Sequence, residues 1–384
     1  MKKTPHYRPL PRRFRRQTLL LVGCGDVGSR IGAQSLARHP ADRLRVIGSA
    51  RRPEQAAALR ALGILPLLAD LDARAGLRRL AGFSRWMIDL APPPPAGGTD
   101  PRSTRLIAAL ARTAHRPLPA FRSAGRGTPG IRPARARREP MTAPAPGAVG
   151  PLRLAPPRTR RRWVYVSTTG VYGDCAGAAF DETRPVAPAS ARAVRRVDAE
   201  RRFRAAGARG LARVAILRVP GIYAHDRLPL DRLRKGLPAL RAEDDVFTNH
   251  VHADDLARIA RAALVRGRPG RVVHAVDDSD MRMGDYFDRV ADTFALPRPP
   301  RVARDELAAL VTPAMLSFMS ESRRLDNRRL KRELRVRLRF ADVDAALADV
   351  ARVDAAPAAP AAPAEPAAPT DRAPAGAAPF QLPA

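Results

Sequence analysis

The chain has 384 residues, enough for one large domain or two smaller ones, and its formal net charge is +32. It contains only two cysteines, Cys24 and Cys175, which excludes a disulfide framework and suits a reducing compartment. No stretch approaches about 20 uninterrupted apolar residues, so we expect no membrane span and a cytoplasmic location. The charge is arginine spread over the whole chain with only 5% aromatic residues, which indicates biased composition more than a specific nucleic-acid surface.

The first part of the chain alternates strand and helix patterns. Residues 1–16 are strongly basic, and we expect a disordered arm there. Apolar runs then predict four strands, at 18–22, 43–50, 64–71 and 86–94. A helical pattern follows each of them, at 26–38, 53–63, 73–83 and from about residue 100. Short strands that alternate with helices indicate a parallel sheet with right-handed crossovers.

The alternation breaks at 116–162, where proline, arginine, glycine and alanine predict a disordered insertion. Later segments predict further elements, namely strands at 163–170, 211–223 and 272–276 and helices at 189–206 and 251–264. An Ala/Pro-rich tail at 350–384 is also expected to be disordered. The prediction is an α/β fold. A Rossmann-type doubly wound parallel sheet spans 17–219, and a smaller mixed C-terminal substrate lobe spans 220–349.

The first strand enters a glycine-rich turn, LLLVGCGDVGSRIG, in which Gly23, Gly25 and Gly28 have GxGxxG spacing. Such glycines allow a tight turn, close approach of backbone N–H groups to a pyrophosphate, and close packing of helix on strand. The following helix N-terminus favours phosphate. The strand–turn–helix context predicts a dinucleotide site that includes Asp26 and Val27, and the alternative is a tight turn without a ligand.

The ends of the next strands indicate which dinucleotide is bound. The second strand ends in GSARRPE, which places Arg51 and Arg52 where an NAD site carries an acid for the ribose hydroxyls. Guanidinium groups there suit a 2′-phosphate, so NADP is favoured and NAD stays open. Asp70, Leu71 and Ala91, at the ends of the third and fourth strands, are expected to contact the same cofactor. For Asp70 the alternative is an aspartate satisfied within its own loop.

Four later segments complete a recognisable order, namely VYVSTTGVYGD, DETRPVAP, LRVPGIY and NHVHADDLA. With the glycine turn, they resemble the extended short-chain dehydrogenase/reductase superfamily, which includes nucleotide-sugar epimerases and dehydratases. The resemblance implies a small-molecule substrate, sugar nucleotides among the options, and a homodimer. It also implies that Thr168 contacts a substrate oxygen, with Ser167 and Thr169 beside it, and that Asn249 lines the substrate pocket. Tyr223, after the Pro-Gly turn, is expected either to face this pocket or to pack in the interior.

The chain departs from this family at its catalytic pair. The relatives carry a tyrosine and a lysine four residues apart on the helix after the fifth strand. The tyrosine transfers a proton, and the lysine holds the ribose and lowers the tyrosine pKa. Counted back from Glu200, these two positions hold Arg192 and Arg196, and the chain contains no YxxxK. An arginine is always protonated and offers no acceptor, although Arg196 keeps donors for a ribose.

Three functional hypotheses stay open. The first is an atypical NAD(P)-dependent oxidoreductase, epimerase/dehydratase-like, in which Thr168 contacts the substrate and Tyr172, Tyr223 or a histidine is the acid or base. The second is a catalytically silent NADP-binding sensor or scaffold. The third, an arginine-rich nucleic-acid binder, predicts steeply salt-dependent binding and is disfavoured. The HVHADD segment at 250–255 suits a strand that leads into a helix better than a metal site, and we expect no metal.

Overall fold

The structure is a computed structural model that describes residues 17–39, 43–80, 83, 85–111, 161–312, 315–316 and 319–355. Three expected disordered segments therefore lie wholly or mostly outside the described residues. They are the basic arm, the insertion apart from its last two expected residues, and the tail beyond residue 355.

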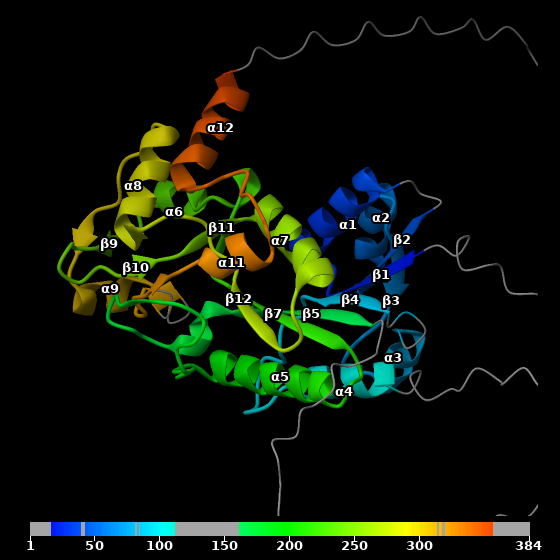
Figure 1. Cartoon of the computed structure of the whole chain (residues 1–384). Coiled ribbons are helices and arrows are strands. Elements are labelled where there is room, and N and C mark those ends of the chain that lie inside the picture. The colour runs from blue at the N-terminus through cyan, green and yellow to red at the C-terminus, as the bar shows by residue number, and fades with distance from the viewer. Residues whose placement is uncertain are drawn as a thin grey trace, which may run out of the picture.

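A seven-stranded parallel sheet forms the centre of the molecule (Figure 1), in the order β12-β7-β5-β4-β1-β2-β3. Its strands are β1 (Gln17–Val22), β2 (Leu44–Ala50), β3 (Leu65–Leu68), β4 (Trp86–Asp89), β5 (Arg162–Thr168), β7 (Arg213–Val219) and β12 (Arg271–His274). From β1 the chain adds β2 and β3 on one side of the sheet, and it then crosses to add β4, β5, β7 and β12 on the other side. The connections that follow β1 and β4 therefore diverge, which leaves a crevice at the carboxyl ends of these two strands.

Helices cover both faces of the sheet, which confirms the doubly wound α/β prediction (Figure 1). One face carries α1 (Asp26–Arg38), α2 (Pro53–Ala61), α7 (Ala253–Arg266) and α11 (Arg328–Glu333). The other carries α3 (Arg74–Leu80), α4 (Pro101–Ala111) and α5 (Ala191–Ala208). Leu20 and Leu21 are both fully buried and belong to different clusters, one on each face. Burial on both faces explains why β1 is continuously apolar.

A smaller lobe of short helices and two-stranded sheets completes the described chain. Its helices are α6 (Leu230–Arg234), α8 (Met283–Thr293), α9 (Arg304–Leu310) and α12 (Val343–Ala355). Its short strands are β8 (Gly221–Tyr223), β9 (Ala239–Leu240), β10 (Phe247–Thr248), β11 (His250–His252), β13 (Met281–Arg282), β14 (Arg301–Val302) and β15 (Arg324–Leu325), and β15 pairs with β6 (Ala179–Phe180). Phe287, Val290, Leu307 and Leu347 form part of a separate apolar core there.

The described chain departs from the expected boundaries in two places. Strand β12 and helix α7 follow residue 220, yet β12 pairs with β7 in the central sheet and α7 packs on that sheet. The chain returns to the sheet after entering the lobe, so a division at residue 219 does not separate the two. Helix α12 continues to Ala355, so residues 350–355 are helical rather than part of the tail, because Val343, Leu347 and Val350 continue one buried helical stripe.

Candidate functional site

A cavity of about 400 Å³ opens at the carboxyl ends of the central strands. Its wall contains the whole glycine turn, namely Gly23, Cys24, Gly25, Asp26, Val27 and Gly28. The ends of β2, β3 and β4 add Arg51, Asp70, Leu71 and Ala91, and α5 adds Arg196. The fold therefore brings together every residue that the sequence assigns to the cofactor except Arg52, which is exposed at the start of α2.

The glycine turn is shaped to admit a phosphate group. Gly23 has φ +74°, and a Cβ built there would lie 2.7 Å from backbone atoms of Ala91, so only glycine fits. A Cβ built on Gly25 would meet nothing within 4 Å, which leaves open space beside the start of α1. No side chain caps the N-terminus of α1. Because uncapped helix N–H groups favour an anion, this open cradle fits the pyrophosphate of a dinucleotide.

The surrounding contacts hold the turn in place and offset its one acidic side chain. The Gly23 N–H donates to Ser49 Oγ at 2.9 Å, and the Cys24 N–H donates to the Ser49 carbonyl at 3.1 Å. The Asp26 carboxylate accepts from Arg30 at 2.9 Å and from Arg227 at 2.7 Å. Burial alone would raise the pKa of Asp26, but these guanidinium groups lower it. The negative charge of Asp26 is thus compensated beside the phosphate cradle.

Two arginines lie at the far end of this cavity, and they differ in their partners. Arg102 is held by Asp72 at 2.6 Å and by the Pro92 carbonyl at 3.0 Å. Arg51 forms no ion pair within 4.0 Å in the described part of the chain, although its charge helps to lower the pKa of Asp72. Arg51 is therefore the cation available to a ligand at the end of β2.

The opposite end of the cavity contains buried polar atoms that lack partners in the described structure. Arg196 is 7% exposed, and its Nη1 donates to Tyr165 Oη and to the Val166 carbonyl, both at 3.0 Å. Its Nε has no hydrogen-bond partner there, and neither does the buried Ser167 Oγ. These atoms fit the ribose and amide oxygens of a nicotinamide nucleotide, because buried donors in proteins are normally satisfied.

A smaller cavity of about 320 Å³ adjoins the first and shares Thr168, Arg192 and Pro220 with it. Its remaining walls come from η3 (Thr169–Tyr172), α5, β8, β10 and the segment before β15, and include Thr169, Asn249, Glu321 and Arg323. Arg192 stands at the position that a tyrosine occupies in the family pattern. Burial, together with the charges of Arg196 and Arg195, lowers the pKa of Arg192.

The predicted substrate residues of this smaller cavity are held by backbone contacts. Thr168 Oγ1 accepts from the Gly170 N–H at 3.3 Å. The Asn249 amide donates to the Arg323 carbonyl at 2.8 Å and accepts from the Leu325 N–H at 2.9 Å. Asn249 thus fixes a wall of the cavity. A hydroxyl that accepts one hydrogen bond can still donate another, so Thr168 remains available to a ligand.

Both tyrosines considered for acid–base chemistry lie outside the lining of the two cavities. Tyr172 is 1% exposed, and its hydroxyl is 2.6 Å from both Arg218 Nη1 and His274 Nε2. Tyr223 is 2% exposed and donates to the Asp342 carbonyl at 3.1 Å. The turn η3 directs Tyr172 into the interior although Thr168 is only four residues away. Neither tyrosine therefore enters our proposed function.

The histidine and aspartate segment has structural partners. Burial lowers the pKa of His250 to about 4, and its ring lies 4.4 Å from that of Tyr286. His252 Nδ1 accepts from the Asp254 N–H at 3.2 Å and caps α7. Within the residues that the structure describes, no group of three or more His, Cys, Asp or Glu side chains is placed to hold a metal ion. Likewise, no helix in the described ranges is long and apolar enough to cross a membrane.

Sequence reasoning missed several residues that line the cavities. Ser49, Gln55 and Arg102 belong to the larger cavity, and Glu321 and Arg323 belong to the smaller one. Arg102 follows the expected helix start near residue 100, where nothing marks it as a lining residue. Glu321 and Arg323 lie between short elements with no motif, and no sequence signal could have found them.

Comparisons with known proteins identify the fold. No protein-family model matches the chain, and no curated protein matches it. A functionally unknown conserved protein from Silicibacter pomeroyi is 26% identical, with a TM-score of 0.65 over 88% of this chain and 100% of that one. UDP-glucuronic acid 4-epimerase from Bacillus cereus, in complex with NAD, is 14% identical, with a TM-score of 0.59 over 88% and 99%. A double mutant of dTDP-glucose 4,6-dehydratase from Streptomyces venezuelae, with NAD bound, is 20% identical, with a TM-score of 0.60 over 87% and 95%.

Proposed function

We propose that the protein binds NADP(H) in the larger cavity and acts as an epimerase/dehydratase-like oxidoreductase on a small polar substrate in the smaller one. The chain shares its fold with NAD-dependent epimerases and dehydratases, which supports a nicotinamide dinucleotide as the cofactor. One observation carries the proposal: the two cavities meet at Thr168, Arg192 and Pro220. A ligand in each cavity would place its reactive end beside the other.

Under this proposal each part of the cofactor contacts different residues of the larger cavity. The pyrophosphate would lie on the turn at Gly25, and the 2′-phosphate would pair with Arg51. Asp70 and Leu71, which follow β3, would contact the adenosine. Ser167 Oγ and Arg196 Nε, which are buried without a partner in the described structure, would hold the nicotinamide riboside. When bound, the nicotinamide supplies or accepts a hydride.

The proposed chemistry uses charge stabilisation in place of a tyrosine. When a substrate carbonyl carbon accepts hydride, its oxygen gains the electron pair of the broken C=O π bond. The guanidinium of Arg192 would stabilise that negative oxygen, and Thr168 would donate a hydrogen bond to it. Water then supplies the proton, because arginine stays protonated. The neighbours named as acting on UDP- and dTDP-sugars make sugar nucleotides the first substrate class to test.

Titration with NADPH and NADH tests the cofactor assignment. A valine side chain at position 25 would fill the open space of the turn, so Gly25→Val should abolish saturable binding. Gly98→Val is the control, because a Cβ at Gly98 also meets nothing and Gly98 does not line the cavity. No NADPH binding by the wild-type protein, or equal loss in both variants, would overturn the proposal.

The preference for NADP has its own matched pair of variants. A charge-assisted hydrogen bond contributes about 1.5–3 kcal/mol, so Arg51→Gln should lower the ratio of NADPH to NADH affinity by roughly 10- to 100-fold. Arg52→Gln removes the same charge one residue away from a side chain that does not line the cavity, and it should leave the ratio within twofold. An equal change in both variants would contradict a specific 2′-phosphate contact.

A catalytically silent NADP-binding protein is the second candidate. The observation that favours it is the pair Arg192 and Arg196 in place of tyrosine and lysine. Incubation of the NADPH-loaded protein with 4-keto sugar nucleotides distinguishes the two functions. Substrate-dependent loss of nicotinamide absorbance that disappears in Arg192→Gln, with NADPH affinity retained, supports the enzyme. Saturable NADPH binding without any turnover favours the silent protein. Dimerisation and cytoplasmic location remain predictions from the sequence.

A further inference from the structure

A third cavity, of about 330 Å³, lies at the opposite edge of the central sheet. Its floor is made by Leu19, Leu44 and Trp86, which stand at or near the starts of β1, β2 and β4. The C-terminal ends of α1 and α7 and the segment after α11 form its rim. All central strands are parallel, so this amino edge is remote from the carboxyl edge where the glycine turn lies. The two cavities share no lining residue.

The charge of this cavity is one-sided. Its described lining has six arginines and one histidine and no acidic residue: Arg38, His39, Arg258, Arg261, Arg266, Arg335 and Arg337. Arg258 pairs with Asp255 at 2.9 Å, and Arg266 donates to the Leu334 carbonyl at 2.6 Å. Burial, and then the charges of Arg38 and Arg258, lowers the pKa of Arg261. Within the described structure Arg261 and Arg337 have no carboxylate partner to offset this repulsion.

Neither the high arginine content of the chain nor the preference of helix C-termini for cations explains all the arginines of this cavity. Arginine is abundant in the whole chain, but elsewhere arginines often pair with carboxylates, as Arg271 does with Glu333 and Arg329 does with Glu182. Cations also suit the C-terminus of a helix, which accounts for residues 38 and 266 in the last turns of α1 and α7. Arg261 lies before the last turn of α7, and Arg337 lies beyond α11. Arg261, half-buried among like charges, is the position that most favours a bound anion.

The apolar part of the cavity indicates what the anion carries. Val265 is 52% exposed on its wall, and Trp86 is only partly buried on its floor. An indole beside guanidinium groups suits a ligand with a flat ring and a phosphate, since aromatic faces stack and guanidinium binds phosphate in bidentate fashion. The volume is in the range of small-molecule sites, whereas duplex nucleic acid is bound by extended basic surfaces.

We propose that this cavity binds a small phosphorylated compound with an aromatic ring, the chemical class of a nucleotide, at a site separate from the dinucleotide cavity. The proposal does not depend on the proposed redox function. The chain has two tryptophans, Trp86 and Trp163, and Trp163 is 1% exposed inside the core. Both tryptophans emit, but only Trp86 lines this cavity, so a change in tryptophan fluorescence on titration reports on it.

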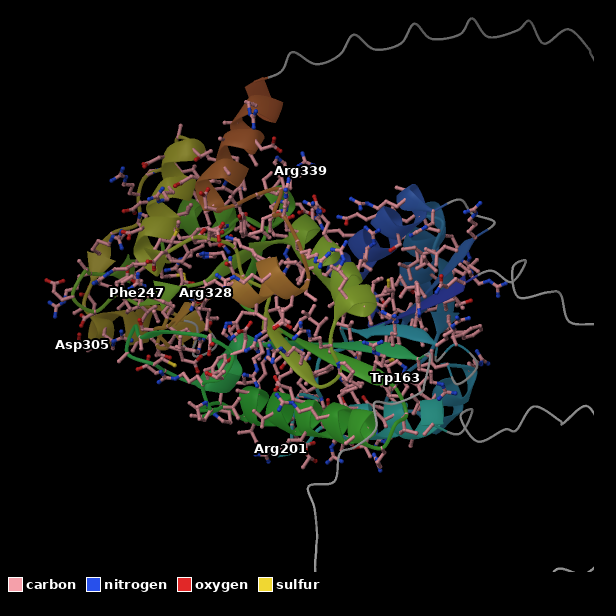
Figure 2. All side chains as sticks on the ribbon, viewed as in Figure 1. Trp163, Arg201, Phe247, Asp305, Arg328 and Arg339 are labelled. Atoms are coloured by element: carbon pink, nitrogen blue, oxygen red, sulfur yellow. The ribbon has the colours of Figure 1, made fainter. Side chains whose placement is uncertain are left out.

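Titration of the full chain with ATP and with inorganic tripolyphosphate, at about 150 mM salt, tests the proposal. Arg261→Gln/Arg337→Gln should weaken ATP binding at least about tenfold, because it removes two of the unpaired phosphate donors. The matched control, Arg201→Gln/Arg209→Gln, removes the same charge from α5 and from its C-cap, on the other face of the sheet, and should leave ATP affinity within twofold. Figure 2 labels Arg201 on α5. Gly25→Val, whose side chain fills the open space of the glycine turn, should also leave the affinity for ATP within twofold of wild type.

Folding is checked by heat unfolding with and without ATP. Removal of repelling charges should not lower the Tm of the double variant, and ATP should raise the Tm of the wild type and of the control only. Arg337 is exposed, so the single variant Arg337→Gln should fold in any case and lose at least about threefold in ATP affinity.

Four results would overturn the proposal. An equal loss of ATP affinity in the Arg261/Arg337 and Arg201/Arg209 double variants would show that ATP is attracted non-specifically by the net charge. Loss in Gly25→Val without loss in the Arg261/Arg337 variant would place ATP in the dinucleotide cavity. Equal affinity for ATP and tripolyphosphate would remove the aromatic part of the assignment. Tighter binding of a DNA duplex than of ATP, sensitive to the same two arginines, would make the site a nucleic-acid surface.

Discussion

Tyr172 belongs to a chain of buried polar contacts rather than to the ligand cavities. Arg218 donates to the Tyr172 hydroxyl at 2.6 Å, and it also donates to Glu200 at 2.7 Å. The Tyr172 hydroxyl then donates to His274 Nε2, because His274 Nδ1 is 3.0 Å from the Asp326 carbonyl, which can only accept. Burial lowers the pKa of His274 to about 4, so this ring stays neutral and each partner is satisfied.

Removal of the Glu200 carboxylate should destabilise the protein, because Arg218 depends on it as a partner. The Glu200 and Arg218 side chains are 4% and 3% exposed, so Glu200→Ala leaves a buried guanidinium uncompensated and should lower the free energy of unfolding by about 3–5 kcal/mol. Asp292→Ala is the control, because Asp292 and Arg298 form an exposed pair whose loss should have a much smaller effect. Urea unfolding followed by circular dichroism measures both variants, and equal effects would contradict the network.

Tyr172→Phe separates a structural role from a catalytic one. It leaves the Arg218 and His274 partners unsatisfied and should lower the free energy of unfolding by about 1–3 kcal/mol. NADPH affinity should stay within twofold, since Tyr172 does not line the larger cavity. A variant as stable as wild type that had lost all turnover would restore Tyr172 to the active site.

Asp89 should make stability depend on pH in a measurable window. Burial raises its pKa to about 7, against the hydrogen bond that it accepts from the Ala91 N–H at 3.0 Å. In the unfolded chain an aspartate titrates near about 3.9. Between these two pH values the folded protein holds a proton on Asp89 that the unfolded chain has already lost. The free energy of unfolding therefore falls as the pH rises through this range, and it stops falling above pH about 7.

Asp89→Asn removes that dependence while it keeps an acceptor for Ala91. Its stability relative to wild type should grow by about 1.4 kcal/mol per pH unit from pH about 5 to 7 and then level off. Asp292→Asn is the control: the hydrogen bond from Arg298 lowers the pKa of Asp292, so its difference from wild type should stay flat over this range. Urea unfolding at four pH values measures both, and a flat difference for Asp89→Asn would contradict the raised pKa.

At the level of elements, the unit from β1 to α1 depends on a close contact between two loops. Gly23 approaches the backbone of Ala91, which follows β4, and a Cβ there would lie 2.7 Å away. Gly210, which follows α5, has the same φ of +74° but open space around a built Cβ. The two glycines therefore separate the cost of a left-handed backbone from the cost of a clash.

Gly210→Ala should lower the free energy of unfolding by about 1–2 kcal/mol, the cost of a left-handed alanine. Gly23→Ala carries the same backbone cost and must also displace the Ala91 backbone, so its loss should be clearly larger and NADPH affinity should fall with it. Heat unfolding and NADPH titration of both variants check this. An equal loss of stability in both variants would show that the glycine turn and the loop at Ala91 can move apart without a loss of free energy.

The elements that the sequence predicted well are those with a local cause. The turn at Gly23 was predictable because a tight strand–turn–helix connection demands glycine at that spacing. Strand β12 was assigned to the lobe because membership in a sheet is set by distant pairing with β7. The end of α12 was missed because its alanines resemble the tail that follows. The meeting of the two cavities at Arg192 depends on how the lobe packs on the sheet, which no local pattern encodes.

For the whole molecule, the excess of positive charge acts on both binding and stability. The formal net charge is +32, while many described arginines are held by carboxylates such as Asp72 and Glu333. Those that lack such partners in the described structure include Arg51 in the dinucleotide cavity and Arg261 in the cavity at the opposite edge. Both proposed ligands are phosphorylated, and each site would gain affinity from the field of the whole protein at low salt.

Salt should therefore stabilise this protein. Self-repulsion from a net charge of +32 opposes the compact state, and salt screens it. Salt also weakens the exposed ion pairs, but each contributes only about 0.2–1 kcal/mol, whereas every excess charge repels many others. We expect the Tm to rise when NaCl is raised from about 20 to about 300 mM. The variant Arg201→Glu/Arg209→Glu has a smaller net charge, so its Tm should rise less. A Tm that falls with salt in both proteins would mean that ion pairs, and not the net charge, dominate the electrostatic free energy of folding.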